Sequence, residues 1–208
     1  GFTISVAQAY GARKFDKMNK YAGNSITLAF VIGMVIMIVA HFLSRPLLKA
    51  IDTPDDIIDM SAQYIDVLYY AVPIQMSLNN FNALSRAVGD SKRPLYFLIV
   101  SVIVNLLLDI LFVGAFKWGV IGAAWATAIS ELVAAVLSAI SVLKYTEEYN
   151  IDKTALKIDG KVSWAQIKIG IPISLQFSIT SIGSMVLQTA VNGFGSSVIA
   201  GFTAAGRV

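Results

Sequence analysis

The 208-residue sequence contains no cysteine and only one histidine, His41, and charged residues make up just 14% of it. The absence of cysteine excludes disulfides, thiolate nucleophiles and Cys-ligated metals, and a single histidine excludes a His-rich zinc site. A soluble domain of average composition carries about 25% charged residues. Hydrophobic residues instead reach 56%, and the mean hydropathy is +0.70. The composition therefore indicates a membrane protein.

The sequence also lacks the motifs of common soluble enzymes. It has no Walker sequence and no glycine-rich dinucleotide fingerprint, and one histidine supplies no recognisable Ser/His/Asp set. We therefore expect no enzymatic activity, no resident metal and no cofactor apart from a coupling ion. The net charge is only +3, and basic loops beside apolar runs indicate membrane orientation rather than nucleic-acid binding.

In place of enzyme motifs, the sequence contains long runs without charged residues. An α-helix needs about 20 mostly apolar residues to cross a bilayer. One run, residues 169–206, is too long for a single crossing and is divided by the turn-forming stretch 192–197. The predicted crossings or part-crossings are residues 1–12, 24–44, 58–86, 94–116, 118–143, 170–192 and 197 onward.

Lysine and arginine concentrate in alternate loops, at residues 13–23, 87–93 and 144–168, which together with the adjacent Arg86 hold 12 of the 16 basic residues. Basic loops remain on the cytoplasmic side of a membrane. We therefore predict a multi-pass protein of the cell inner (plasma) membrane with these three loops in the cytoplasm. The first and the last residues of the sequence both lie within apolar spans, so we also expect the sequence to be an internal part of a longer protein.

The longest connection, residues 144–168, is predicted to be a cytoplasmic linker, because such a segment often joins two structural repeats of a transporter. Its last part, around Trp164 and Lys168, suits a short helix lying in the membrane interface. The predicted organisation is an N-terminal lobe at 1–143, the linker at 144–168 and the start of a C-terminal lobe at 169–208.

Asp109 is the strongest candidate for a functional group within the spans, because an ionisable residue in a membrane helix is costly and usually has a functional or pairing role. Asn105 precedes it by four residues, so both side chains share one helical face. A carboxylate with an amide oxygen suits a hard cation such as Na⁺, and a desolvated Asp can instead take up a proton. The alternative is an Asp that only holds helix packing.

Glu131 follows Thr127 by four residues and is either a secondary coupling residue or a structural acid facing the lobe interior. Asp66 and His41 are close to the outer ends of their helices, and we interpret them as hydrated or interfacial residues. The span at 170–192 carries several polar side chains but no acidic residue. These side chains either hydrogen-bond to neighbouring helices or line a cavity. The candidates for lining a cavity are Gln176, Thr180 and Gln188.

Five short motifs occur in the order seen in the multidrug and toxic compound extrusion (MATE) family. They are Gln-Ala-Tyr-Gly-Ala at 8–12, Arg-Ala-Val-Gly-Asp-Ser-Lys-Arg-Pro at 86–94, Asn-Leu-Leu-Leu-Asp at 105–109, Gly-Val-Ile-Gly-Ala-Ala-Trp-Ala-Thr at 119–127 and Ile-Gly-Ile-Pro-Ile at 169–173. In this respect the chain resembles the end of helix 2, helices 3 to 6, the linker, helix 7 and the start of helix 8 of that family. The implied fold is an all-α, polytopic transmembrane helix bundle, part of a two-lobe (6+6 helix) transporter.

The resemblance implies a cation-coupled (H⁺ or Na⁺) antiporter that exports organic, often cationic compounds by alternating access. In the family, an N-lobe ion site uses an Asp of helix 1, an Asn and an Asp of helix 5 and a Thr of helix 6; Asn105, Asp109 and Thr127 match the last three. Some NorM-like members carry an acid on helix 7 where this chain has Thr180, so the resemblance is to the DinF-like branch.

The implied partners are the lipid bilayer and small organic substrates, with no nucleic acid, and the sequence leaves the oligomeric state open. The alternative function is a flippase for lipid-linked precursors or polysaccharides from the same wider superfamily. Such a flippase needs basic groups to hold a pyrophosphate, and the central portions of these spans contain no Lys or Arg.

Overall fold

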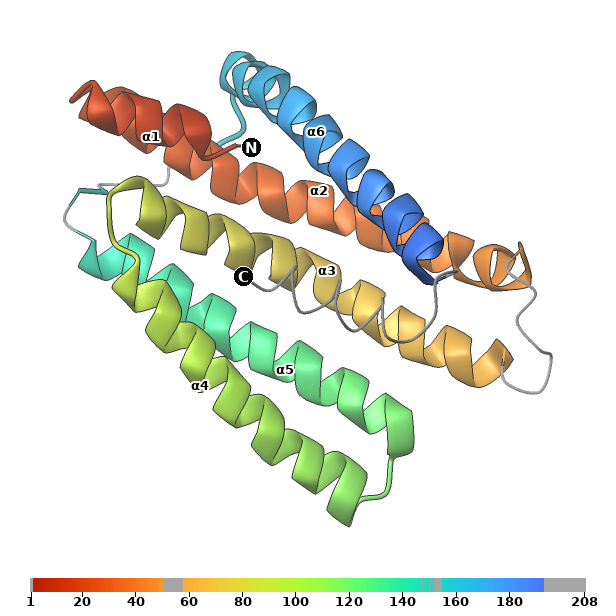
Figure 1. Cartoon of the computed structure of the whole chain (residues 1–208). Helices are drawn as coiled ribbons and strands as arrows, with labels where there is room; N and C mark the ends of the chain where they lie inside the picture. Colours follow the sequence, from red (N-terminus) through yellow and green to blue (C-terminus); the bar gives the residue numbers. More distant parts are fainter. Residues whose placement is uncertain (1, 51–57, 147, 150, 152–154, 193–208) are drawn as a thin grey trace. The chain divides into compact units, whose positions relative to one another are not determined.

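The computed structural model describes residues 2–50, 58–146, 148, 149, 151 and 155–192 (Figure 1). All regular elements in these ranges are helices, which confirms the predicted all-α class. The chain forms two compact units, residues 2–166 and a second unit whose described part is residues 167–192. The predicted lobe boundaries stay predictions.

Six α-helices and two π-helical segments make up the described chain. They are α1 (Ile4–Gly11), α2 (Phe15–Ala50), α3 (Ile58–Ala87), α4 (Lys92–Asp109), η1 (Ile110–Ala115), α5 (Gly119–Ile140), η2 (Ser141–Tyr145) and α6 (Gly160–Asn192). Four stretches are long and apolar enough to cross a membrane: Phe15–Lys49, Lys92–Ala115, Gly119–Lys144 and Gly160–Leu187. Helix α3 is equally long but rich in amide side chains and is not among the four, so its crossing stays a prediction. The predicted span from 197 onward lies outside the described residues.

Two helices begin earlier than predicted. The predicted loop 13–23 is mostly helical, because α2 begins at Phe15 with Asp16 in its first turn, where an acidic side chain interacts favourably with the helix dipole. The interfacial helix expected near Trp164 is not a separate element but belongs to the first turns of α6. Asp159 caps these turns, because its carboxylate accepts hydrogen bonds from the backbone N–H groups of Lys161 and Val162, at 2.8 and 3.2 Å.

Helix α3 is the central helix of the 2–166 unit. It packs against α2 and against α5, α4 packs on α5, and α1 packs on α2 and α3 (Figure 1). The α2–α3 contact depends on Gly33, where an added Cβ would lie 2.7 Å from the Cα of Pro73. Helix α4 has few neighbours, and nearly all of its side chains are at least partly exposed.

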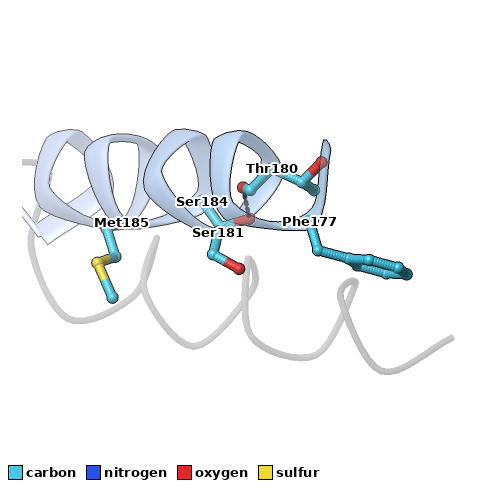
Figure 2. A pocket seen from close by; sticks show the side chains of 5 residues that line it. All are labelled: Phe177, Thr180, Ser181, Ser184 and Met185. Atoms are coloured by element: carbon cyan, nitrogen blue, oxygen red, sulfur yellow. Dashed lines mark hydrogen bonds between the residues drawn. The ribbon is translucent and has the colours of Figure 1, made fainter. Parts of the chain in front are cut away.

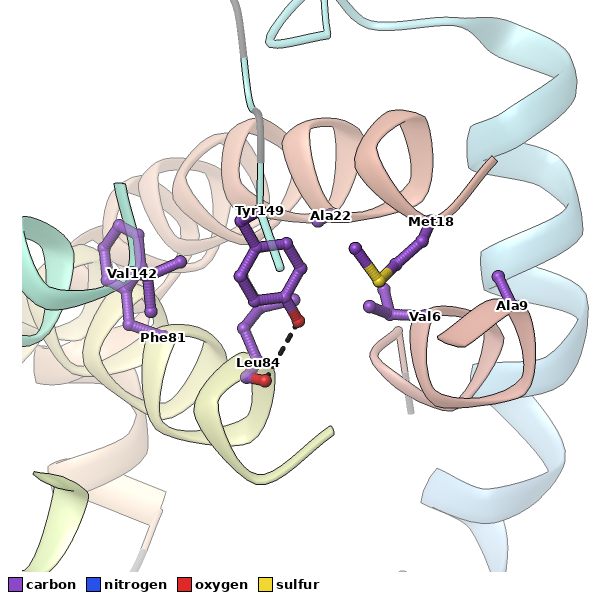
Figure 3. Packing of buried hydrophobic residues seen from close by; sticks show 8 residues of the cluster. All are labelled: Val6, Ala9, Met18, Ala22, Phe81, Leu84, Val142 and Tyr149. Atoms are coloured by element: carbon purple, nitrogen blue, oxygen red, sulfur yellow. Dashed lines mark hydrogen bonds between the residues drawn. The ribbon is translucent and has the colours of Figure 1, made fainter. Parts of the chain in front are cut away.

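A hydrophobic cluster holds one end of this unit together, where α1, the start of α2, the end of α3 and η2 meet (Figure 3). Its members are Val6, Ala9, Met18, Ala22, Phe81, Leu84, Val142 and Tyr149. The Tyr149 hydroxyl donates a hydrogen bond to the backbone oxygen of Leu84 at 3.0 Å. Burial, together with nearby Glu148 and Tyr10, raises the pKa of Tyr149. The neutral phenol of Tyr149 therefore links the segment after η2 to α3 by a hydrogen bond.

The connection from α3 to α4 is a tight, capped turn. Gly89 has a φ of +88°, a left-handed conformation that glycine adopts without steric cost. The Asp90 carboxylate accepts hydrogen bonds from the backbone N–H groups of Lys92 and Arg93, both at 3.1 Å. Pro94 follows in the first turn of α4, where a missing N–H is tolerated. The motif at 86–94 therefore encodes a helix reversal.

The buried side chain of Asn24 anchors the end of the 144–168 connection to α2. Its amide nitrogen donates to Gln166 Oε1 at 2.8 Å and to Ser163 Oγ at 3.1 Å. Its amide oxygen accepts from the backbone N–H of Asp159 at 3.0 Å. Gln166 in turn donates to the backbone oxygen of Tyr21 at 2.9 Å. Asn24 is 1% exposed and Gln166 0%, so these hydrogen bonds fix the first turns of α6 on α2.

Candidate ion site and neighbouring polar groups

The packing of α4 on α5 brings Asn105 and Thr127 together. The Nδ2 of Asn105 donates a hydrogen bond to the Oγ1 of Thr127, with the two atoms 3.5 Å apart. The Thr127 hydroxyl donates to the backbone oxygen of Ala123 at 3.0 Å, which fixes its direction. Both side chains are half-buried. Two residues that are 22 positions apart thus meet at one point between the helices.

Asp109 is the last residue of α4, four positions after Asn105 on the same helical face. Its side chain is half-buried, and its Oδ1 is buried without a hydrogen-bond partner in the described part of the chain. The π-helical segment η1 starts at the next residue, Ile110. Such segments frequently occur at functional sites, and a buried carboxylate oxygen without a partner is costly unless something binds it.

These three side chains supply one carboxylate, one amide and one hydroxyl. Oxygen ligands with a single negative charge suit a monovalent hard cation, and the carboxylate alone suits a proton. No group of three His, Cys, Asp or Glu side chains that could hold a metal occurs in the described ranges.

Glu131 on α5 accepts a hydrogen bond from a side chain of α3. The Nε2 of Gln75 donates a hydrogen bond to the Oε1 of Glu131 at 3.1 Å. Sequence reasoning missed Gln75, because helical spacing along α5 does not show which residue of α3 faces a given position. The high amide content of α3 was the only available signal.

Asp66 is less hydrated than expected. Its Oδ1 lies 3.2 Å from the Nδ1 of His41, and its side chain is 24% exposed. The expectation of a hydrated Asp66 is therefore wrong, because the α2–α3 contact places it beside His41. The His41 side chain is 42% exposed, and its interpretation as an interfacial residue stays a prediction. This pair supplies a carboxylate with a different environment from Asp109 and Glu131.

The candidates on α6 lie in the second unit, where most described side chains are exposed. Thr180 lines an open pocket of about 440 Å³ with Phe177, Ser181, Ser184 and Met185 (Figure 2). The Thr180 hydroxyl donates to the backbone oxygen of Gln176 at 2.9 Å, so it is bonded within its own helix. Gln176 is exposed but is not among these lining residues. The Gln188 side chain lies outside what the structure describes.

Comparison with known proteins identifies relatives over the whole length of the chain. The family model MatE matches residues 1–111. The probable multidrug resistance protein YoeA of Bacillus subtilis (strain 168) is 30% identical over 215 residues, covering 100% of this chain and 46% of the relative. The multidrug export protein MepA of Staphylococcus aureus (strain bovine RF122 / ET3-1) is 23% identical over 197 residues, covering 95% and 44%. The chain thus spans about half the length of the curated relatives it matches.

Solved structures show the same helical architecture. A crystal structure of MATE in the bent conformation superposes with a TM-score of 0.86 at 24% identity, covering 99% of this chain and 46% of that chain. A likeness at this level of identity demonstrates a shared fold and leaves the chemistry of the site to the residues themselves.

Proposed function

The chain belongs to the MATE family, and on that premise we propose that the full-length protein is a multidrug exporter driven by an H⁺ or Na⁺ gradient. The family and the apolar helices make it a multi-pass membrane protein. The names of YoeA and MepA, which refer to multidrug resistance and export, support the proposed activity. We place the protein in the cell inner membrane, with the basic loops in the cytoplasm, and in the DinF-like branch.

The observation that carries the coupling role is the Oδ1 of Asp109, which is buried and has no hydrogen-bond partner among the residues that the structure describes. Asn105 and Thr127 meet one helical turn away and supply further oxygen atoms for a cation. An occupied site neutralises Asp109 and so reduces the cost of a charge within the membrane. An empty site restores that cost. Ion binding therefore favours one conformation of the transporter over another, which is the requirement for coupling.

Transport by reconstituted protein tests this proposal. The full-length protein is placed in proteoliposomes, and ethidium transport is measured under an imposed Na⁺ gradient and, separately, an imposed pH gradient. We expect Asp109→Asn to abolish gradient-driven transport and Thr127→Val to raise the ion concentration needed for half-maximal rate. Asp66→Asn is the matched control, because it removes the same charge from a carboxylate paired with His41.

The two gradients distinguish H⁺ from Na⁺ as the coupling ion. Wild-type ethidium transport with no response to either gradient would contradict cation coupling, and unchanged transport by Asp109→Asn would contradict the role of Asp109. A flippase would move a lipid-linked pyrophosphate and not ethidium. Lys92 and Arg93 lie at the start of α4, whereas the polar side chains farther along α4 and α5 are neutral or acidic. This favours export of organic cations over binding of a pyrophosphate. The candidate groups among them are Asn105, Asp109, Thr127 and Glu131.

A further inference from the structure

We propose that Glu131 and Gln75 form a recognition site for the positively charged group of an organic substrate, distinct from the ion site at Asp109. This inference rests on the proposed export function and assigns substrate charge to a particular pair of side chains. The pair joins α3 to α5 through the 3.1 Å hydrogen bond from Gln75 Nε2 to Glu131 Oε1.

The carboxylate of Glu131 has no ion-pair partner in the described part of the chain. Its hydrogen-bond donor, Gln75, is neutral. Glu131 is twelve residues from the start of α5, which places it about 18 Å along the helix and near the middle of the span. A charge at that depth faces protein or a water-filled cavity rather than lipid.

The carboxylate is also accessible on the surface of its unit. Gln75 is exposed and Glu131 is half-buried, and the exposed Asn79 follows Gln75 by one turn on the same side of α3. Neighbours of Glu131 on α5 are small, because Ala128 and Ala134 are each three positions away. Because these alanines are themselves buried, a ligand would reach the carboxylate from the exposed side of the pair, where Gln75 and Asn79 lie.

The chemistry of the pair favours an organic cation over Na⁺. Hard metal cations need several oxygen ligands at short distance, but Gln75 directs its N–H group at the carboxylate, so it adds a donor rather than an oxygen. A quaternary or aromatic cation makes few directional bonds and requires mainly an opposite charge in a poorly hydrated place. Asp109 instead shares a helical face with Asn105, which is bonded to Thr127, and these oxygen-bearing side chains are the ones proposed for the hard cation.

Binding of tetraphenylphosphonium to the full-length protein in nanodiscs tests the inference, with the neutral dye Nile red as the comparison ligand. We expect Glu131→Gln to weaken tetraphenylphosphonium binding at least tenfold and to change Nile red binding less than twofold. Glu131→Asp retains the charge and should bind the cation within about threefold of wild type. Asp66→Asn, the matched control, should bind like wild type, and unchanged elution on size exclusion verifies folding of each variant.

Wild-type affinity for tetraphenylphosphonium in Glu131→Gln would overturn the inference, as would an equal loss of cation and neutral dye, which indicates a structural role. Failure of the export proposal is recognised separately, because wild-type proteoliposomes would then not transport ethidium. Gradient-driven transport in the wild type with unaltered cation binding in Glu131→Gln refutes only the role of Glu131.

Discussion

Replacing Asn24 by alanine should release the end of the 144–168 connection from α2. The substitution removes the amide that donates to Gln166 and Ser163 and accepts from the backbone of Asp159. The backbone of α2 is unaffected, because alanine is a good helix former. The predicted change is therefore local opening of residues 155–166 with the rest of the unit intact.

The magnitude follows from the burial of the groups that lose a partner. A buried polar group left unsatisfied costs about 1–3 kcal/mol. Gln166 is fully buried, so its Oε1 should contribute about 2 kcal/mol, whereas water can reach the N–H of exposed Asp159 and reduce its share to about 0.5 kcal/mol. Ser163 should add about 0.5 kcal/mol more. The free energy of opening should therefore fall by about 3 kcal/mol in total, which shifts the opening equilibrium about 100-fold.

Trypsin cleavage measures this opening directly. Lys157 and Lys161 are exposed in the anchored segment, but a protease needs a locally unfolded chain, and its rate follows the open population when closing is fast. Cleavage of the full-length protein at these two sites, followed by mass spectrometry, should be about 100-fold faster in Asn24→Ala than in wild type.

Two further variants control this experiment. Asn79→Ala makes the same change at an exposed position of α3 and should leave cleavage unchanged. Ser163→Ala removes one partner of Asn24 while leaving the bonds to Gln166 and Asp159, so cleavage should be faster by no more than about tenfold. Cleavage of Asn24→Ala at the wild-type rate would show that the anchor is not what protects the segment.

Two other predictions concern stability, measured by thermal unfolding of the full-length protein in detergent. Gly33→Leu should lower the melting temperature by several degrees, because even a Cβ there would lie 2.7 Å from the Cα of Pro73, whereas Gly11→Ala has nothing within 4 Å and should be neutral. Tyr149→Phe should cost about 1 kcal/mol through loss of the hydrogen bond to Leu84; an unchanged melting temperature would show that water replaces that bond.

The helices could be predicted from the sequence because hydropathy and loop charge report directly on membrane crossing. The limits of α2 and α6 could not, since a helix continues into water wherever its backbone is capped and no proline or glycine stops it. Apolarity identifies only the segment within the bilayer. Lys17 and Lys20 therefore belong to the first turns of α2 although their charge is typical of a loop.

The candidate site was predictable only in part. Spacing placed Asn105 and Asp109 on one face, and the family resemblance added Thr127. The partners of Glu131 and Asn24 were not predictable, because Gln75 and Gln166 are 56 and 142 positions away from them and reach them only through helix packing. Local spacing contains no information on the rotation of one packed helix against another.

The proposed ion site is divided between two helices, and this division has a thermodynamic consequence. Asn105 is on α4 and Thr127 on α5, so a cation held by both depends on the spacing of those helices. By linkage, ion binding and helix separation affect each other by the same free energy. The Ser101 hydroxyl, which donates to the backbone oxygen of Ser130 at 3.1 Å, is remote from Asp109 along α4 yet contributes to that spacing. We therefore expect the ion affinity of the proposed site to depend on the whole α4–α5 interface, including residues that never contact the ion.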